Sequence, residues 1–136
     1  MEDCIFCKII AGEIPSSKVY EDEQVLAFLD ISQVTPGHTL VVPKEHFRNM
    51  LEMDGEAAGQ LFACIPTIAR KVMKATDAKG MNIINNNEVI AGQTVFHTHV
   101  HLAPRYTEDD DLNVTFVAHE PDFPALAALA EKISNA

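Results

Sequence analysis

The chain has 136 residues, of which 47% are hydrophobic and 22% are charged, and this length suits a single globular domain over residues 1–136. Its 20 acidic and 10 basic residues give a net charge of −10, so its electrostatic field repels nucleic acid and anionic membranes. Generic polyanion binding is therefore excluded as the basis of function. The anomaly in the composition is the group of 6 histidines, because three of them lie within five residues of one another.

The sequence carries no sign of a membrane or export segment. No apolar stretch approaches the roughly 20 residues that a membrane-spanning helix needs. The chain begins Met1-Glu2-Asp3, which is acidic where a signal peptide is basic, so we expect a cytoplasmic protein. The 3 cysteines are an odd number, which argues against a disulfide framework.

The first part of the chain predicts a short helix followed by three strands. Residues 4–11 are apolar and end at Gly12, which is typical of a short helix with a glycine stop. A turn is expected at residues 35–37. The predicted strands are short and are bounded by turn residues: residues 19–21, 25–29 and 38–42.

The clearest predicted helix begins at Asp54, which can cap it. Its apolar residues recur at helical spacing and form one stripe: Ala58, Leu61, Phe62, Ile65, Ala69, Val72 and Met73. We expect this stripe to pack on a sheet. Pro66 falls inside the pattern and predicts a kink or a break.

The rest of the chain predicts two more strands and a final helix. The strands are expected at residues 81–84 and 95–102, joined by the polar loop 85–94, and the acidic run 108–111 is expected to be a solvated loop. The helix is expected from about Asp122 to Ser134, with three side chains facing inward: Leu126, Leu129 and Ile133. Together these elements predict the α+β class: an antiparallel sheet with one long and one short helix packed on it, and a C-terminal helix.

The strongest chemical feature is the predicted strand over residues 95–102. Side chains alternate across a strand, so one face is expected to carry His97, His99 and His101. The other face carries apolar side chains that we expect to pack against the long helix: Phe96, Val100 and Leu102. Packing alone does not require three imidazoles on one face, so the pattern indicates function.

Two kinds of chemistry suit three neighbouring imidazoles. They can bind a transition metal, or one of them can act as a nucleophile while the others supply protons and phosphate contacts. The preceding loop, residues 91–94, contains Gly92, an amide and a hydroxyl, which together suit a phosphoryl oxygen. A glycine-containing loop is by itself a weak signal.

These residues carry a resemblance to a known family. The segment Gly92–His101 reads GQTVFHTHVH and resembles the signature of the histidine triad superfamily, in its Hint-like branch. The resemblance continues through Ile5–Ile10, Leu26–Ile31 and Gly37–Lys44, and covers roughly residues 4–105 in order. It implies the histidine triad fold.

The resemblance also implies an activity and a site. Members cleave at the α-phosphate of nucleoside monophosphate conjugates, such as purine nucleoside phosphoramidates. His99 would attack phosphorus and form a covalent nucleotidyl-histidine intermediate, from which water releases the nucleoside monophosphate. His101 would contact the α-phosphate and His38 would extend the histidine network. The implied substrate-binding residues are Phe6, Ile9, Phe28 and Ile31 at the base, Asp30 at the ribose hydroxyls, Asn86 near the ribose and phosphate, and Gln93 and Thr94 at the phosphate. A homodimer is also implied.

The Cys4–Cys7 pair has the spacing Cys-x-x-Cys, which by itself is compatible with a metal site, a redox motif or two small buried side chains. A closed zinc site needs four ligands, and the pair supplies two. Some bacterial histidine triad proteins, and the related galactose-1-phosphate uridylyltransferases, hold zinc with two further histidines. By this resemblance, a structural zinc would be held by Cys4, Cys7, His46 and His97.

Three other functions compete with the phosphoramidate hydrolase. The nearest is a hydrolase of dinucleoside polyphosphates, which is the activity of a sister branch with the same triad. A metal-dependent hydrolase would use all three motif histidines as ligands. A nucleotide-binding or scaffold protein with vestigial hydrolysis would bind nucleotide without needing His99.

Overall fold

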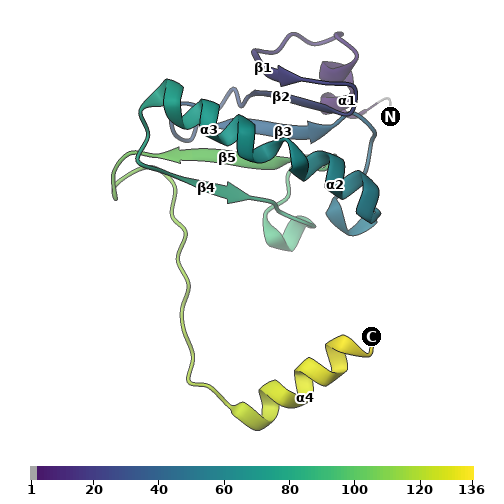
Figure 1. The fold of residues 1–136 in the computed structure, drawn as a ribbon, viewed down its shortest axis with the longest axis vertical. Coiled ribbons are helices and arrows are strands. Elements are labelled where there is room, and N and C mark those ends of the chain that lie inside the picture. The colour runs from purple at the N-terminus through teal and green to yellow at the C-terminus, as the bar shows by residue number, and fades with distance from the viewer. Residues whose placement is uncertain (1–2) are drawn as a thin grey trace.

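The structure, a computed structural model, describes residues 3–136, so the first two residues of the expected domain lie outside it. Its centre is one five-stranded sheet in the order β1-β2-β3-β5-β4, in which every neighbouring pair is antiparallel (Figure 1). The strands are β1 (Lys18–Glu21), β2 (Val25–Leu29), β3 (Thr39–Pro43), β4 (Gly80–Ile84) and β5 (Val100–Arg105). The predicted α+β class with an antiparallel sheet is confirmed.

Helices α2 (Gly55–Ala63) and α3 (Ile65–Thr76) run across one face of this sheet (Figure 1). The core on this side joins alternate strand residues to the helical stripe: Val25, Ala27, Val41, Val100 and Leu102 with Leu61, Ile65, Ile68 and Val72. Val100 and Leu102 therefore pack against the long helical segment, as predicted. Phe96 does not belong to this core and lies instead beneath the guanidinium of Arg48, with Cζ 4.3 Å from the ring centroid.

Helix α1 (Ile5–Ile10) packs on the opposite face of the sheet. The core on this side is made by Phe6, Ile9, Leu26, Phe28, Leu40 and Val42. Because Leu26 and Phe28 alternate with Val25 and Ala27, β2 buries both of its faces. This second core supports the histidines described below.

The predicted long helix is two helices. Asp54 caps α2 as expected, its carboxylate accepting from the Ala57 N–H at 2.8 Å. Pro66 stands in the first turn of α3, where its missing N–H is harmless, but it cannot donate back to the carbonyl of Phe62. The helical ladder is therefore interrupted at Cys64, which ends α2 and precedes α3.

Strand β5 begins later than predicted, at Val100 rather than residue 95. Its pairing with β3 covers only Val41↔Val100 to Thr39↔Leu102. Pro43 has no N–H to continue this ladder, and its carbonyl accepts from the ring of His97 at 2.8 Å instead. His97 and His99 thus lie in an irregular segment that precedes the strand.

Helix α4 (Phe123–Ser134) differs from expectation in its packing. The helix is present, but Leu126, Leu129 and Ile133 are 53%, 53% and 67% exposed, so the prediction that they face inward is wrong. The preceding segment carries α4 away from the sheet, and Figure 1 shows it separated from the rest of the chain. We name residues 113–136, all of which are exposed, the C-terminal arm. No helix within residues 3–136 is long and apolar enough to cross a bilayer.

Candidate active site and metal centre

The three motif histidines lie side by side on the face of the sheet that carries α1. His97 and His99 are buried and His101, on β5, is half-buried. The ring of Phe6 meets His97 and His99 edge-on, with centroid distances of 5.9 and 5.1 Å. The rings of His99 and His101 are 5.0 Å apart. The shared face that the sequence predicted therefore exists, although only His101 belongs to a regular strand.

Side-chain and loop contacts hold the irregular segment in place of a strand ladder. The N–H of Thr98 donates to the carbonyl of Phe47 at 2.8 Å, and its hydroxyl donates to the same carbonyl at 3.1 Å. The amide of Asn85 donates to the carbonyl of His99 at 3.0 Å. Thr98 and Asn85 are thus the residues that fix the backbone of His99. Neither role is predictable from the sequence, because nothing in the sequence shows that β5 begins only at Val100.

His99 is held as a neutral imidazole with one defined tautomer. Its Nδ1 lies 2.8 Å from the carbonyl oxygen of His97, which can only accept, so Nδ1 carries the proton. Burial lowers the pKa of His99. The remaining nitrogen, Nε2, therefore has a free lone pair, which is the form of imidazole that attacks an electrophile.

His38 and His101 form a second ordered pair. The N–H of Val34 donates to Nδ1 of His38 at 3.3 Å, so the proton of His38 lies on Nε2. That nitrogen lies 2.9 Å from Nδ1 of His101, which leaves the proton of His101 on its own Nε2. Burial lowers the pKa of His38. Burial also lowers the pKa of His101, and the neighbouring His99 and His38 lower it further, to about 4. His101 can thus donate a hydrogen bond without being charged.

A cavity of about 740 Å³ opens beside Phe6 and Asp30. Its lining includes six of the eight residues expected to bind substrate: Phe6, Ile9, Phe28, Asp30, Ile31 and Thr94. Phe6 forms one wall and also touches His99, while Phe28 meets Phe6 edge-on at 5.6 Å. Oδ2 of Asp30 lies 3.8 Å from Nε2 of His38, which joins the cavity to the histidine pair. The structure therefore brings an apolar slot, a carboxylate and the histidines together.

The two remaining candidates, Gln93 and Asn86, lie in the loop between β4 and β5. The Gln93 side chain is buried, and its Oε1 accepts from the N–H of Glu88 at 2.8 Å and from Asn49 at 3.2 Å. Its Nε2 donates to the carbonyls of Arg48 and Val95 at 2.7 and 3.1 Å. Both ends of the Gln93 side-chain amide are therefore hydrogen-bonded to other groups of the protein.

Asn86 faces the turn in the same loop. A methyl group built on Gly92 would lie 3.6 Å from its Nδ2. Gly92 has φ +93°, a conformation that suits glycine. Asn86 therefore packs against the turn that leads to Thr94.

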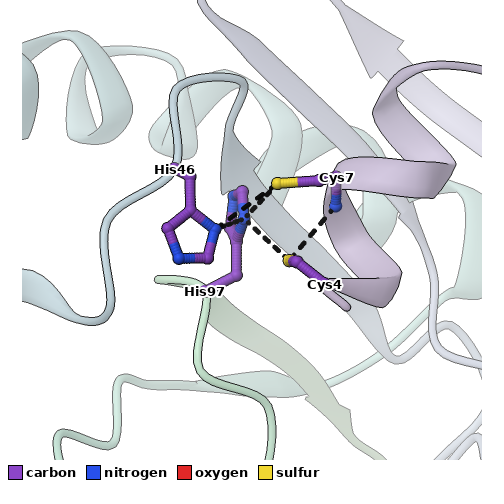
Figure 2. Close-up of side chains that lie close together, drawn as sticks. All are labelled: Cys4, Cys7, His46 and His97. Carbon is purple, nitrogen blue, oxygen red and sulfur yellow. Dashed lines mark hydrogen bonds between the residues drawn. The ribbon is translucent and has the colours of Figure 1, made fainter. Parts of the chain in front are cut away.

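The two cysteines and two histidines proposed for zinc converge at one point (Figure 2). Nδ1 of His97 lies 3.3 Å from Sγ of Cys4 and 3.5 Å from Sγ of Cys7. Nδ1 of His46 lies 3.4 Å from Sγ of Cys7 and 3.1 Å from Nδ1 of His97. Helix α1 supplies the sulfur ligands because Cys4 caps it and Cys7 is one turn further along.

These separations fit a tetrahedral zinc ion. Zn–S bonds of about 2.3 Å and Zn–N bonds of about 2.0–2.1 Å give S···N edges of about 3.6 Å and N···N edges of about 3.3 Å. Nε2 of His97 donates to the carbonyl of Pro43, so the free lone pair of His97 lies on the nitrogen that faces the sulfurs. Burial raises the pKa of the Cys7 thiol, as does the adjacent Cys4, and a cation between them would remove this cost. The cluster is compatible with zinc.

The alternative in which all three motif histidines bind one metal has no support in the described residues. Among residues 3–136, two groups could hold an ion: the Cys4–Cys7–His46–His97 cluster, and Asp30 with His38 and His101. His99 belongs to neither group. His97 therefore belongs to the possible metal cluster, and His99 stands outside both groups.

Known proteins place the chain in a family. A profile described as HIT domain matches residues 11–108, and the chain belongs to the HIT, or histidine triad, family. It is 55% identical over 122 residues to Protein hit of Bacillus subtilis, across 90% of this chain and 84% of that protein. It is 39% identical over 132 residues to adenosine 5'-monophosphoramidase hnt1 of Schizosaccharomyces pombe, across 97% of this chain and 96% of that protein. A crystal structure from Streptococcus mutans UA159 superposes with a TM-score of 0.96 at 67% identity, covering 99% of this chain and 85% of that chain.

Proposed function

We propose that this protein is a nucleotide hydrolase that cleaves nucleoside monophosphate conjugates, of the purine nucleoside phosphoramidate type, at the α-phosphate. The observation that carries the proposal is the neutral His99, whose Nδ1 proton is bound to the His97 carbonyl at 2.8 Å beside a nucleotide-sized cavity. The family and the phosphoramidase relative support the same activity.

The chemistry follows from the tautomers. Nε2 of His99 attacks phosphorus, and the bond from phosphorus to the leaving nitrogen breaks. The nitrogen takes a proton from solvent and departs as the amine, and the water consumed in the second step returns that proton. The Nε2–H of His101 donates to a phosphate oxygen, and His38 keeps that proton in place through Nδ1 of His101. Water then attacks phosphorus in the nucleotidyl-histidine, releases the nucleoside monophosphate and restores neutral His99.

The cavity suits a nucleoside. Phe6, Ile9, Phe28 and Ile31 offer apolar surface for a base, and the carboxylate of Asp30 can accept from ribose hydroxyls. Oδ1 of Asp30 already accepts from the N–H of Ser32 at 2.7 Å, which fixes the carboxylate and leaves Oδ2 for the sugar. Thr94 lines the same cavity and supplies a hydroxyl for the phosphate.

We propose further that Cys4, Cys7, His46 and His97 hold a structural zinc, as expected of a bacterial Hint-like protein with Cys-x-x-Cys. The ion ties α1 to the segment before β5. His97 would bind it through its ring while its carbonyl accepts the Nδ1 proton of His99. Zinc would therefore steady the nucleophile without touching the substrate.

A homodimer is the assembly we propose. The C-terminal arm exposes a series of large apolar side chains: Val114, Phe116, Val117, Phe123, Leu126, Leu129 and Ile133. A single chain leaves them uncovered, and a second copy would bury them. The superposition on the Streptococcus mutans structure covers 99% of this chain, so the arm is common to both.

One experiment tests the activity. Wild type, His99→Ala and the control His119→Ala are incubated with adenosine phosphoramidate and, separately, with a diadenosine polyphosphate. His119 is exposed in the C-terminal arm, and its replacement should leave AMP release unchanged. We expect His99→Ala to lose more than about 10³-fold in rate. AMP release by His99→Ala at the wild-type rate would refute the nucleophile. Faster cleavage of the polyphosphate by wild type would favour the rival hydrolase.

A further inference from the structure

The loop between β4 and β5 contains a residue in a backbone conformation that usually requires glycine. Glu88 has φ 77° and ψ 159°. Residues other than glycine rarely adopt these backbone angles. Where one does, contacts with the surrounding structure hold it in that conformation. Glu88 stands directly before η2 (Val89–Ala91) and five residues before Gln93. The strain therefore lies at the start of the turn that leads to Thr94 in the nucleotide cavity.

The Glu88 side chain is held by two consecutive residues from the other side of the loop. The guanidinium of Arg48 makes a bidentate contact with the carboxylate: Nε donates to Oε2 at 2.9 Å, and Nη2 donates to Oε1 at 2.8 Å. Nδ2 of the buried Asn49 donates to Oε2 at 2.7 Å. These bonds lower the pKa of Glu88 to about 2, so the carboxylate stays charged and available. The bidentate pair joins two exposed side chains, and the buried amide of Asn49 adds a third bond, so the three groups form a clamp on Glu88.

The backbone of the clamped residue sets the loop geometry. Its N–H donates to Oε1 of Gln93, and its carbonyl accepts from the N–H of Gln93 at 3.2 Å. Nε2 of Gln93 donates back to the carbonyl of Arg48. The residues that hold the Glu88 side chain therefore also hold Gln93, and the next residue is Thr94. A change of backbone conformation at Glu88 would break both of its bonds with Gln93.

We propose that Glu88 is a positioning residue, and that the Arg48–Asn49 clamp keeps it in a glycine-like conformation so that Thr94, at the end of this turn, meets the nucleotide phosphate. The inference rests on the proposed function, because the phosphate is the ligand that this loop would meet. The clamp is needed only because residue 88 is not glycine. A glycine at position 88 adopts the same φ and ψ without strain and needs no clamp.

The test compares AMP with adenosine, which differ only in the phosphate. Calorimetry measures both affinities for wild type, Glu88→Ala, Glu88→Gly, Arg48→Gln and the double variant Arg48→Gln/Glu88→Gly. Glu88→Ala keeps the strain without the clamp, and we expect its preference for AMP over adenosine to fall about ten- to hundredfold. Arg48→Gln should behave similarly. Glu88→Gly should keep the preference for AMP over adenosine within about threefold of the wild-type value. Adding Arg48→Gln to Glu88→Gly should then hardly change this preference.

A readout without nucleotide isolates the structural half of the inference. Hydrogen exchange at the amides of residues 91–95 should accelerate in Glu88→Ala and remain slow in Glu88→Gly. An unchanged AMP preference in folded Glu88→Ala would overturn the inference, as would equal losses in Glu88→Ala and Glu88→Gly. Wild type that binds AMP no better than adenosine would instead refute the proposed function, so the two failures are distinguishable.

Discussion

Two glycines with similar backbone angles have very different surroundings, and they make a matched pair for testing the packing beneath His38. Gly12 has φ +82° and Gly37 has φ +94°. A methyl group at Gly12 would meet nothing within 4 Å. At Gly37 it would lie 2.8 Å from Cγ2 of Thr76 and 3.2 Å from Cγ of Pro104. The substitution to alanine therefore carries conformational strain at both sites and a steric clash only at Gly37.

The two costs can be estimated separately. A left-handed backbone costs an alanine about 1–2 kcal/mol relative to glycine, and this term applies to both variants. Forcing an extra methyl group into a packed core costs a further ~1–3 kcal/mol. Thr76 cannot easily rotate away, because its hydroxyl donates to the carbonyl of Val72 at 2.7 Å. The loss of unfolded-state entropy is the same for both substitutions and cancels in the comparison.

The measurement is urea unfolding of wild type, Gly12→Ala and Gly37→Ala at pH 7 with zinc in excess. We expect Gly37→Ala to lower the free energy of unfolding by about 1–3 kcal/mol more than Gly12→Ala does. Gly37 precedes His38, so a shifted turn should also slow AMP release in Gly37→Ala and leave it unchanged in Gly12→Ala. Equal destabilisation by the two substitutions would refute the packing argument, because the clash is the term by which their costs are expected to differ.

Four other predictions concern the site and the assembly. Cys7→Ser should weaken zinc binding more than about tenfold by elemental analysis after dialysis, whereas Cys64→Ser should keep full metal content. Asp30→Asn should weaken AMP binding about ten- to hundredfold by calorimetry but leave 2'-deoxy-AMP less affected, because a charged hydrogen bond contributes ~1.5–3 kcal/mol. The pKa of His101 is lowered from 6.5 to about 4, so the unfolded chain takes up this proton first as pH falls. The free energy of unfolding should therefore decrease as the pH falls from about 6.5 to 4. In urea titrations, His101→Asn should reduce the slope of this decrease by up to ~1.4 kcal/mol per pH unit. Removal of residues 112–136 should convert a dimer into a monomer by light scattering, and a full-length chain that is already monomeric at micromolar concentration would contradict the proposed assembly.

Local sequence patterns predicted most of the fold, and they failed where the outcome depends on groups distant in the chain. The break near Pro66 follows from one missing N–H, so the sequence predicts it directly. The start of β5 does not, because it depends on Pro43 ending the ladder of a neighbouring strand. The periodicity of the sequence correctly predicts helix α4. It cannot predict whether the apolar side chains of the helix pack against the same chain, and in this structure they are exposed.

The candidate site shows the same division. The Cys-x-x-Cys spacing places two sulfurs one helical turn apart, and the family resemblance identified the two histidines that complete the set. The resemblance also named six residues that line the cavity beside Phe6 and Asp30. It gave no indication of Glu88, because a strained backbone has no signature in the residue type. The Asn85–Asn87 run likewise reads as an ordinary polar loop until its contact with the His99 carbonyl is seen.

The contacts of His97 predict that a metal bound at the cysteine–histidine cluster would affect His99. His97 meets the metal cluster through Nδ1, meets Pro43 through Nε2, and meets His99 through its backbone carbonyl. Rotation of its ring after metal loss would free the Pro43 carbonyl and loosen the segment that carries His99. Loss of a metal bound there should therefore lower the rate of AMP release, although the four cluster residues do not line the cavity beside Phe6 and Asp30. The proposed metal ligand His97 and the proposed nucleophile His99 are two residues apart and are linked by the hydrogen bond from Nδ1 of His99 to the His97 carbonyl, so a zinc ion at the cluster would act by positioning His99.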